Sequence, residues 1–138
     1  MEPNELCQLA VEAMGHAYVP YSGYKVGAAL LCADGTVYQG GNIENAAYSP
    51  TNCAERTAIF KAVYDGHRDF TAIAVCGGKD GAITGAFPPC GVCRQVMREF
   101  CKDDFLIYLV NDKGYETVTL AQLLPYGFSA GEHMSANG

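Results

Sequence analysis

Three cysteines have the spacing of a metal-dependent catalytic site. Cys90 and Cys93 form a Cys-x-x-Cys pair at the start of an expected helix, whose N-terminus favours thiolates that can point at one metal. Taken alone, this pair fits a metal site and a dithiol redox site equally well. Cys53 also stands just before an expected helix and supplies a third thiolate. Three protein ligands and an open position for water are typical of catalytic zinc, whereas structural zinc takes four ligands.

A fourth protein ligand is not apparent in the sequence. No further cysteine stands at a ligand spacing, and the histidines are isolated along the chain: His16, His67 and His133. The four other cysteines are expected to be small buried apolar residues: Cys7, Cys32, Cys76 and Cys101.

Glu55 follows Cys53 by two residues and is placed to serve a metal-activated water. A carboxylate there can carry the proton of that water to a leaving amine. A capping box, with Asn52 as N-cap and Glu55 as the third helical residue, explains the same residues equally well. Three thiolates leave the site negatively charged, so we expect Arg56 to offset that charge from a position behind the metal ligands. Arg94 fits the same role and that of a solvated helix arginine equally well.

Composition indicates one globular domain with a small-molecule substrate. The chain has 138 residues, 49% of them hydrophobic and 17% charged. Its net charge of −6 and scattered basic residues argue against a nucleic-acid partner. The N-terminus lacks the layout of a secretory signal, and the longest apolar stretch, 26–33, is too short to span a membrane. We therefore expect a cytoplasmic protein with reduced cysteines and no membrane partner.

Alternating helices and strands must position these residues. Periodicity and turn signals predict an α/β domain over residues 1–128, followed by a C-terminal tail over 129–138. The expected helices cover 4–18, 53–64, 91–100 and 119–124. The expected strands cover 26–32, 36–39, 70–76, 105–110 and 116–118, with a hairpin turn at Asp34-Gly35 and the third strand in the centre of a mixed sheet.

Two segments resemble the signature of the cytidine deaminase superfamily: Cys53-Ala54-Glu55 and Pro89-Cys90-Gly91-Val92-Cys93. The segment Asn42-Ile43-Glu44-Asn45-Ala46-Ala47-Tyr48 is similar to that of the small enzymes acting on free nucleosides. The resemblance implies a three-layer α/β/α sandwich with a five-stranded mixed sheet. It also implies a homotetramer with sites at subunit interfaces and one Zn²⁺ per chain, bound by Cys53, Cys90 and Cys93.

The reaction implied is hydrolytic deamination of cytidine and deoxycytidine to uridine and deoxyuridine, with release of ammonia, in pyrimidine salvage. A zinc-bound hydroxide would attack C4 while Glu55 contacts the ring nitrogen and shuttles protons. The resemblance also assigns Arg56 as a hydrogen-bond donor to the thiolates.

Substrate-binding roles are likewise implied by the resemblance. Asn42 and Glu44 would bind the ribose hydroxyls, and the backbone of Ala54 would bind the pyrimidine carbonyl. Tyr24 would line the pocket where the family usually has Phe, and Pro88 stands where Ser is common. Three residues would complete sites in neighbouring subunits: Ala46, Tyr48 and Phe128.

Other functions remain as alternatives to this hypothesis. The same chemistry could act on an aminonucleoside antibiotic, on guanine or on RNA, although the segment 42–48 and the acidic charge speak against that. A non-enzymatic zinc module would need a fourth ligand. A dithiol redox protein would leave Cys53 unexplained.

Overall fold

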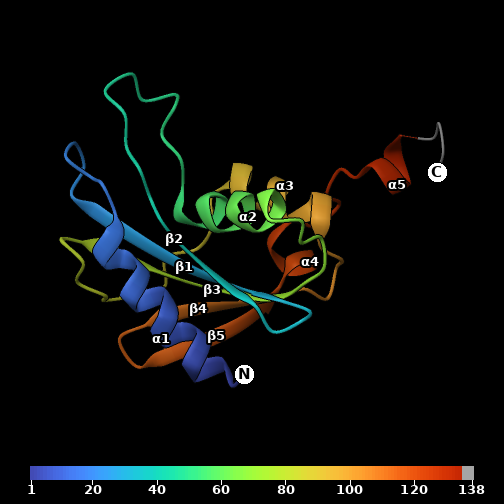
Figure 1. The fold of residues 1–138 in the computed structure, drawn as a ribbon, viewed down its shortest axis with the longest axis horizontal. Coiled ribbons are helices and arrows are strands. Elements are labelled where there is room, and N and C mark those ends of the chain that lie inside the picture. Colours follow the sequence, from blue (N-terminus) through green and yellow to red (C-terminus); the bar gives the residue numbers. More distant parts are fainter. Residues whose placement is uncertain (135–138) are drawn as a thin grey trace.

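The computed structural model describes residues 1–134 and contains one five-stranded sheet in the order β2-β1-β3-β4-β5 (Figure 1). Strands β3 and β4 are parallel, and the other neighbouring pairs are antiparallel. The expectation of a mixed sheet with the third strand in its centre is therefore confirmed. The strands are β1 (Tyr24–Cys32), β2 (Val37–Gly41), β3 (Phe70–Lys79), β4 (Leu106–Asn111) and β5 (Gly114–Thr119).

Helices cover both faces of the sheet, which confirms the three-layer α/β/α arrangement (Figure 1). One face carries α1 (Pro3–Ala13), which continues into the short 3-10 helix η1 (Met14–His16). The other face carries α2 (Ala54–Tyr64), α3 (Gly91–Phe100) and α4 (Leu120–Leu123). Within residues 1–134, none of the helices has the length and apolar character needed to cross a membrane.

Alternation along β3 divides the core between these two layers. Ala72, Ala74 and Cys76 belong to the apolar cluster under α1, and Ile73 and Val75 belong to the cluster under α2 and α3. Successive side chains of a strand point to opposite faces, so a strand covered on both sides must be apolar throughout. This is the sequence pattern of residues 70–76.

Gly40 in β2 sets how closely α2 packs on the sheet. A Cβ atom at this position would lie 2.6 Å from the Ala58 nitrogen and closer still to the carbonyl oxygen of Ala54. Both are backbone atoms of α2 and cannot rotate away. Gly40 therefore allows α2, whose N-cap is Cys53, to pack directly against the backbone of β2.

Three sequence expectations differ from the structure. The helix expected over 4–18 is α-helical only to Ala13 and continues as η1 to His16. Helix α2 begins at Ala54 with Cys53 as its N-cap, so Glu55 is the second helical residue rather than the third. The capping-box explanation of Asn52 and Glu55 is therefore wrong; the Asn52 side chain instead donates a hydrogen bond to Thr57 Oγ1, at 3.1 Å. The expected C-terminal tail contains a short helix, α5 (Ala130–His133), and its residues 135–138 lie outside the described part of the chain.

Candidate active site

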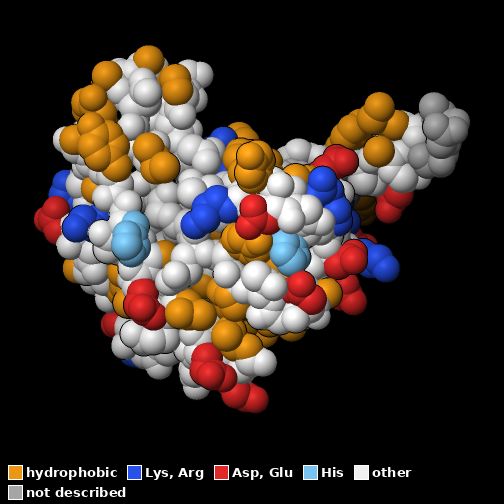
Figure 2. Space-filling view, in the orientation of Figure 1, with side chains coloured by type: hydrophobic (Ala, Val, Ile, Leu, Met, Phe, Trp, Pro, Cys, Tyr) orange, Lys and Arg blue, Asp and Glu red, His pale blue; other side chains and the backbone are white. Residues whose placement is uncertain are grey.

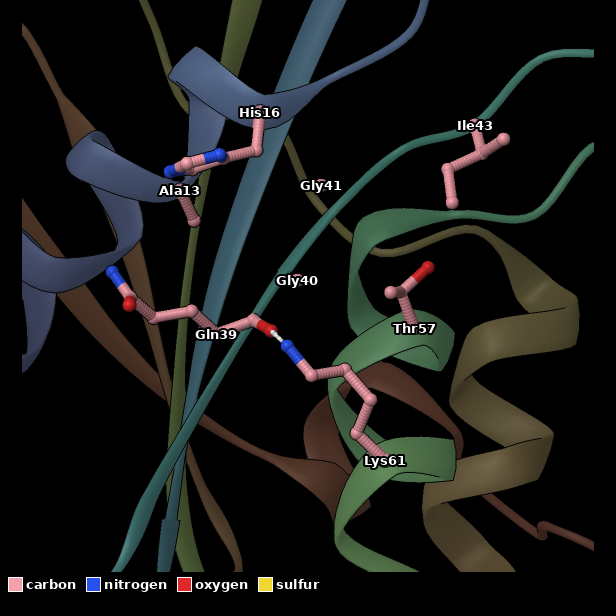
Figure 3. Close-up of a pocket in the computed structure, with 8 residues that line it drawn as sticks. All are labelled: Ala13, His16, Gln39, Gly40, Gly41, Ile43, Thr57 and Lys61. Atoms are coloured by element: carbon pink, nitrogen blue, oxygen red, sulfur yellow. Dashed lines mark hydrogen bonds between the residues drawn. The ribbon is translucent and has the colours of Figure 1, made fainter. Parts of the chain in front are cut away.

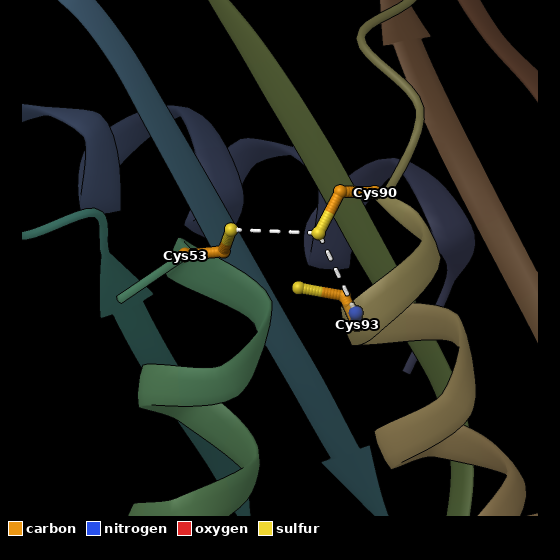
Figure 4. A group of neighbouring side chains, drawn as sticks. All are labelled: Cys53, Cys90 and Cys93. Carbon is orange, nitrogen blue, oxygen red and sulfur yellow. Dashed lines mark hydrogen bonds between the residues drawn. The ribbon is translucent and has the colours of Figure 1, made fainter. Parts of the chain in front are cut away.

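The three cysteines predicted to bind metal converge between the N-termini of α2 and α3 (Figure 4). Cys53 is the N-cap of α2, Cys90 is the N-cap of α3, and Cys93 lies in the first turn of α3. Their sulfur atoms all lie within 4.8 Å of one another, and those of Cys53 and Cys90 are 3.7 Å apart. Two helix N-termini thus point their partial positive charge at one group of sulfurs, which favours thiolates.

This donor set fits Zn²⁺. Thiolates are preferred zinc ligands, and three of them leave the fourth tetrahedral position open. Hydrogen bonds from Cys93 and Arg56 lower the pKa of Cys53 to about 5, although burial opposes the shift. Three sulfurs this close to one another do not all ionise unless a cation lies between them. Cys53, Cys90 and Cys93 therefore form a zinc site.

Two arginines hold the cysteine group in place through hydrogen bonds. Arg56 donates a hydrogen bond from Nη2 to Cys53 Sγ at 3.2 Å, which places a positive charge against the thiolates. Arg94 donates from Nε to the carbonyl oxygen of Pro89 at 2.7 Å and from Nη1 to that of Leu123 at 2.8 Å. Arg94 is therefore not a solvated helix residue; it ties the loop preceding Cys90 to α4.

Among residues 1–134, Glu55 is the one charged residue that is buried, with 3% of its surface exposed. Burial raises the pKa of Glu55 to about 7, and the charge of Cys53 adds to the shift. A carboxyl with this pKa can both accept and release a proton near neutral pH. Burying a carboxyl away from solvent destabilises the fold, so its place beside the sulfurs indicates a chemical role.

A cavity of about 260 Å³ opens onto this group and joins it to the predicted substrate residues. Its lining includes Tyr24, Asn42, Glu44, Ala54 and Glu55, together with Cys53 and Cys90. Ala54 is the first residue of α2, so its N–H has no partner within the helix and is available to a bound molecule. The sequence thus places acid–base, metal-binding and polar recognition groups around one cavity.

The Glu44 carboxylate is held by the loop before β1. Oε1 accepts hydrogen bonds from the backbone N–H groups of Tyr21, at 3.0 Å, and Ser22, at 3.1 Å, and Oε2 accepts one from Ser22 Oγ. The Ser22 hydroxyl makes the largest contribution to lowering the pKa of Glu44. Glu44 is therefore an ionised acceptor fixed in the wall of the cavity.

Asn42 is fixed by the backbone of β1. Its Oδ1 accepts from Val26 N–H and its Nδ2 donates to the Tyr24 carbonyl, each at 2.9 Å. An amide NH₂ has two donors, so one remains for a ligand.

Ser22 and Phe87 are among the residues of the cavity wall to which sequence reasoning gave no role. Phe87 stacks on Tyr24 with a centroid distance of 6.3 Å, and Lys79 Nζ lies 5.3 Å from the centroid of the Tyr24 ring. Phe87 lies in a Gly- and Pro-rich loop without periodicity, so nothing in the sequence marked it. Ser22 could have been found from its place beside Tyr24, but only the fold brings it to Glu44.

Three predicted substrate residues lie outside this cavity. Ala46 and Tyr48 belong to the long loop between β2 and α2, which projects from the body of the molecule (Figure 1). Hydrophobic side chains gather on this projection (Figure 2), and Tyr48 is 76% exposed. Phe128 follows α4, is 53% exposed and stacks on His133. Their predicted roles in neighbouring subunits remain predictions.

A separate cavity of about 340 Å³ lies along the edge strand β2, between η1 and α2 (Figure 3). Its lining includes His16 and Lys61 but none of the three cysteines, Glu55 or Glu44. The Lys61 ammonium group is bound to the carbonyl oxygen of Gln39 at 2.5 Å. This cavity is therefore distinct from the candidate active site.

The chain is similar to known proteins over nearly its whole length. Residues 1–109 match the family described as the cytidine and deoxycytidylate deaminase zinc-binding region. A cytidine deaminase from Sporosarcina psychrophila is 54% identical over 130 residues, covering 94% of this chain and 93% of that protein. One from Halalkalibacterium halodurans is 50% identical over 131 residues, covering 94% and 96%. The crystal structure of cytidine deaminase from Burkholderia pseudomallei is 44% identical, with a TM-score of 0.86 over 93% of this chain and all of that chain.

Proposed function

We propose a substrate, a course of proton transfer and an assembly for this chain, on the premise that it belongs to the zinc-dependent cytidine and deoxycytidylate deaminase family. The proposed reaction converts cytidine or deoxycytidine and water to uridine or deoxyuridine and ammonia. The observation that carries this proposal is one cavity lined by Cys53 and Cys90 of the cysteine cluster, by the buried carboxyl of Glu55 and by the fixed carboxylate of Glu44.

Zinc bound by the three cysteines would supply a water activated for attack near neutral pH. The Glu55 carboxylate takes one proton from the attacking water and delivers it to ring N3; it then takes the proton of the C4 hydroxyl and delivers it to the departing amino group. The C4–N bond breaks and a C4 carbonyl forms, so the products are the uracil nucleoside and ammonia. The depth at which Glu55 is buried supports this role, because a proton held there does not exchange freely with bulk water.

The cavity wall would orient the nucleoside. We propose that Glu44 accepts a hydrogen bond from a ribose hydroxyl and that the free Asn42 amide donor binds beside it. The unused Ala54 N–H would bind the pyrimidine carbonyl, and Tyr24 would contact the nucleoside from the cavity wall. The fixed carboxylate disfavours a substrate that lacks the hydroxyl, because the acceptor position of Oε2 that Ser22 leaves free is then unpaired. Cytidine and deoxycytidine both carry the 3′-hydroxyl, so both are proposed substrates.

We further propose that the active form is a homotetramer in the cytoplasm, serving pyrimidine salvage. Tyr48 supports the assembly: it is 76% exposed and has a φ of 63°, a left-handed conformation that is costly for a tyrosine. An exposed aromatic side chain held in a strained conformation on a projecting loop suits contact with another subunit. Ala46 and Phe128 would be the other residues donated across subunit contacts.

The substrate assignment is tested with purified protein whose zinc content has been measured. Loss of ultraviolet absorbance is followed with cytidine, deoxycytidine, guanine and blasticidin S in parallel. Conversion of the two pyrimidine nucleosides at about one zinc per chain supports the proposal. Turnover of only guanine or the antibiotic would contradict the assigned substrate, and light scattering that gives a monomer during full activity would contradict the tetramer.

A further inference from the structure

A second group of metal-binding side chains lies at the opposite end of the sheet from the zinc site. Cys32 ends β1, Asp34 lies in the turn to β2, and His67 lies between α2 and β3. One ligand atom from each lies within 4.8 Å of the other two, the same limit that the zinc cysteines meet. From Tyr24 in the active-site cavity to Cys32, β1 extends about 26 Å at about 3.3 Å per residue. The two groups are therefore independent, and His67, isolated in the sequence, is not isolated in the fold.

The surrounding residues hold this group in place. Asp34 Oδ1 accepts a hydrogen bond from Thr36 N–H at 3.0 Å, which fixes the carboxylate in the turn. The His67 ring packs edge-on against Tyr38, with a centroid distance of 5.4 Å and an interplanar angle of 65°. Asp34 Oδ2 lies 3.7 Å from His67 Nδ1, which is too long for a hydrogen bond. Within residues 1–134, neither Cys32 Sγ nor the His67 ring nitrogens make a hydrogen bond.

The donor types select a class of metal. A thiolate, an imidazole and a carboxylate together suit a first-row transition ion such as Zn²⁺ or Co²⁺ better than Ca²⁺ or Mg²⁺. Tetrahedral bonds of about 2.0 to 2.3 Å place ligand atoms about 3.3 to 3.8 Å apart, so closure shortens any of the three separations by at most about 1.5 Å. The Asp34 and His67 side chains are 59% and 24% exposed, which gives an ion access and leaves room for water as a fourth ligand.

Separate structural roles explain only parts of this arrangement. A buried Cys32 is an ordinary apolar core residue, and an exposed Asp34–His67 pair contributes little to stability. Neither role accounts for three different metal-binding groups, from the β1–β2 segment and the α2–β3 loop, whose ligand atoms lie within 4.8 Å of one another. We propose that Cys32, Asp34 and His67 bind a second divalent transition-metal ion, which links the β1–β2 turn to the α2–β3 loop.

The test adds Co²⁺ to the zinc-loaded protein and follows the charge-transfer absorption of a thiolate–cobalt bond, with zinc and cobalt counted after gel filtration. The proposal predicts that one Co²⁺ binds per chain while the original zinc is retained. His67→Gln and Asp34→Asn each remove one ligand at an accessible position. Loss of a group that only hydrogen-bonds a metal ligand weakens metal binding by up to about 100-fold, so loss of a ligand itself should weaken Co²⁺ binding by at least that factor. His16→Gln, which alters an exposed histidine in the separate cavity, should bind Co²⁺ like the parent chain.

Three outcomes would overturn the proposal. One is no Co²⁺ retained beyond the original zinc, and another is Co²⁺ retained only by displacing that zinc. The third is undiminished binding by both His67→Gln and Asp34→Asn, with circular dichroism showing that each variant is folded. Because the test counts metal and not turnover, it is independent of the proposed substrate.

Discussion

Replacing Arg56 with glutamine removes the positive charge that lies against the zinc thiolates. Arg56 Nη2 is 3.2 Å from Cys53 Sγ, and the hydrogen bond joins two charged groups. Burial tends to lower the pKa of Arg56, but hydrogen bonds to Cys53 and Cys93 and their charges raise it overall, so the guanidinium stays charged. Hydrogen bonds to charged groups contribute about 1.5 to 3 kcal/mol. If the bond strengthens the site by that amount in the transition state, its loss slows turnover about 10- to 150-fold.

The assay compares kcat and KM for cytidine at matched zinc content. Arg56→Gln should lower kcat with little change in KM, because Arg56 acts through the thiolates and does not line the cavity. Arg56→Lys keeps the charge but loses the planar donor geometry, so its kcat should lie between those of the parent and Arg56→Gln. Arg68 donates to backbone carbonyls at the other end of α2, so Arg68→Gln is the matched control.

A zinc-replete Arg56→Gln protein with the kcat of the parent would refute this reasoning. It would mean that the charge of the three thiolates needs no compensation for the reaction. A rate loss as large in Arg68→Gln would refute it as well, because the effect would then follow from a general change in α2.

Three further changes test the packing and the cavity. Gly40→Ala should lower the Tm by roughly 4 to 12 °C, because over-packing costs about 1 to 3 kcal/mol and each kcal/mol shifts the Tm by about 4 °C. Gly15→Ala is the control, because its added Cβ meets no atom within 4 Å. Ser22→Ala should raise the KM for cytidine about 5-fold, or about 1 kcal/mol, and an unchanged KM would show that Glu44 needs no support from Ser22. Burial raises the thiol pKa from 9.0 to about 11 in Cys7 and to about 12 in Cys76 and Cys101. Because the folded state holds these protons more tightly than the unfolded state, the thiols contribute their full stability below about pH 9 and lose it as the pH rises toward 11 to 12. A urea midpoint that stays constant up to pH 11 would contradict this effect.

Much of the fold could be predicted because its signals are local. The Asp34-Gly35 turn, the apolar run at 70–76 and the helix over 91–100 each follow from neighbouring residues, and the structure places β1–β2, the central β3 and α3 there. The start of α2 was harder to predict. Asn52 and Cys53 both suit an N-cap position, and the choice depends on the tertiary contacts that bring Cys53 to Cys90.

The metal ligands were also accessible to sequence reasoning, because cysteine type and spacing are themselves the signal. The cavity wall was only partly accessible, since its contacts join residues far apart in the chain. Ser22 reaches Glu44 only after β1 and β2 have paired, and Phe87 reaches Tyr24 only after β1 and β3 have paired. The grouping of His67 with Cys32 likewise depends on where the β1–β2 turn meets the end of α2.

The decisive measurement is the turnover of Glu55→Gln, because this change keeps the size of the side chain and removes its proton chemistry. The rate of cytidine loss is compared with that of the parent at equal zinc content. We expect about one zinc per chain and a rate lower by about 10²- to 10⁴-fold, the usual contribution of general acid–base catalysis. A zinc-replete variant that deaminates cytidine at nearly the parent rate would contradict this expectation and leave Glu55 without a role in proton transfer.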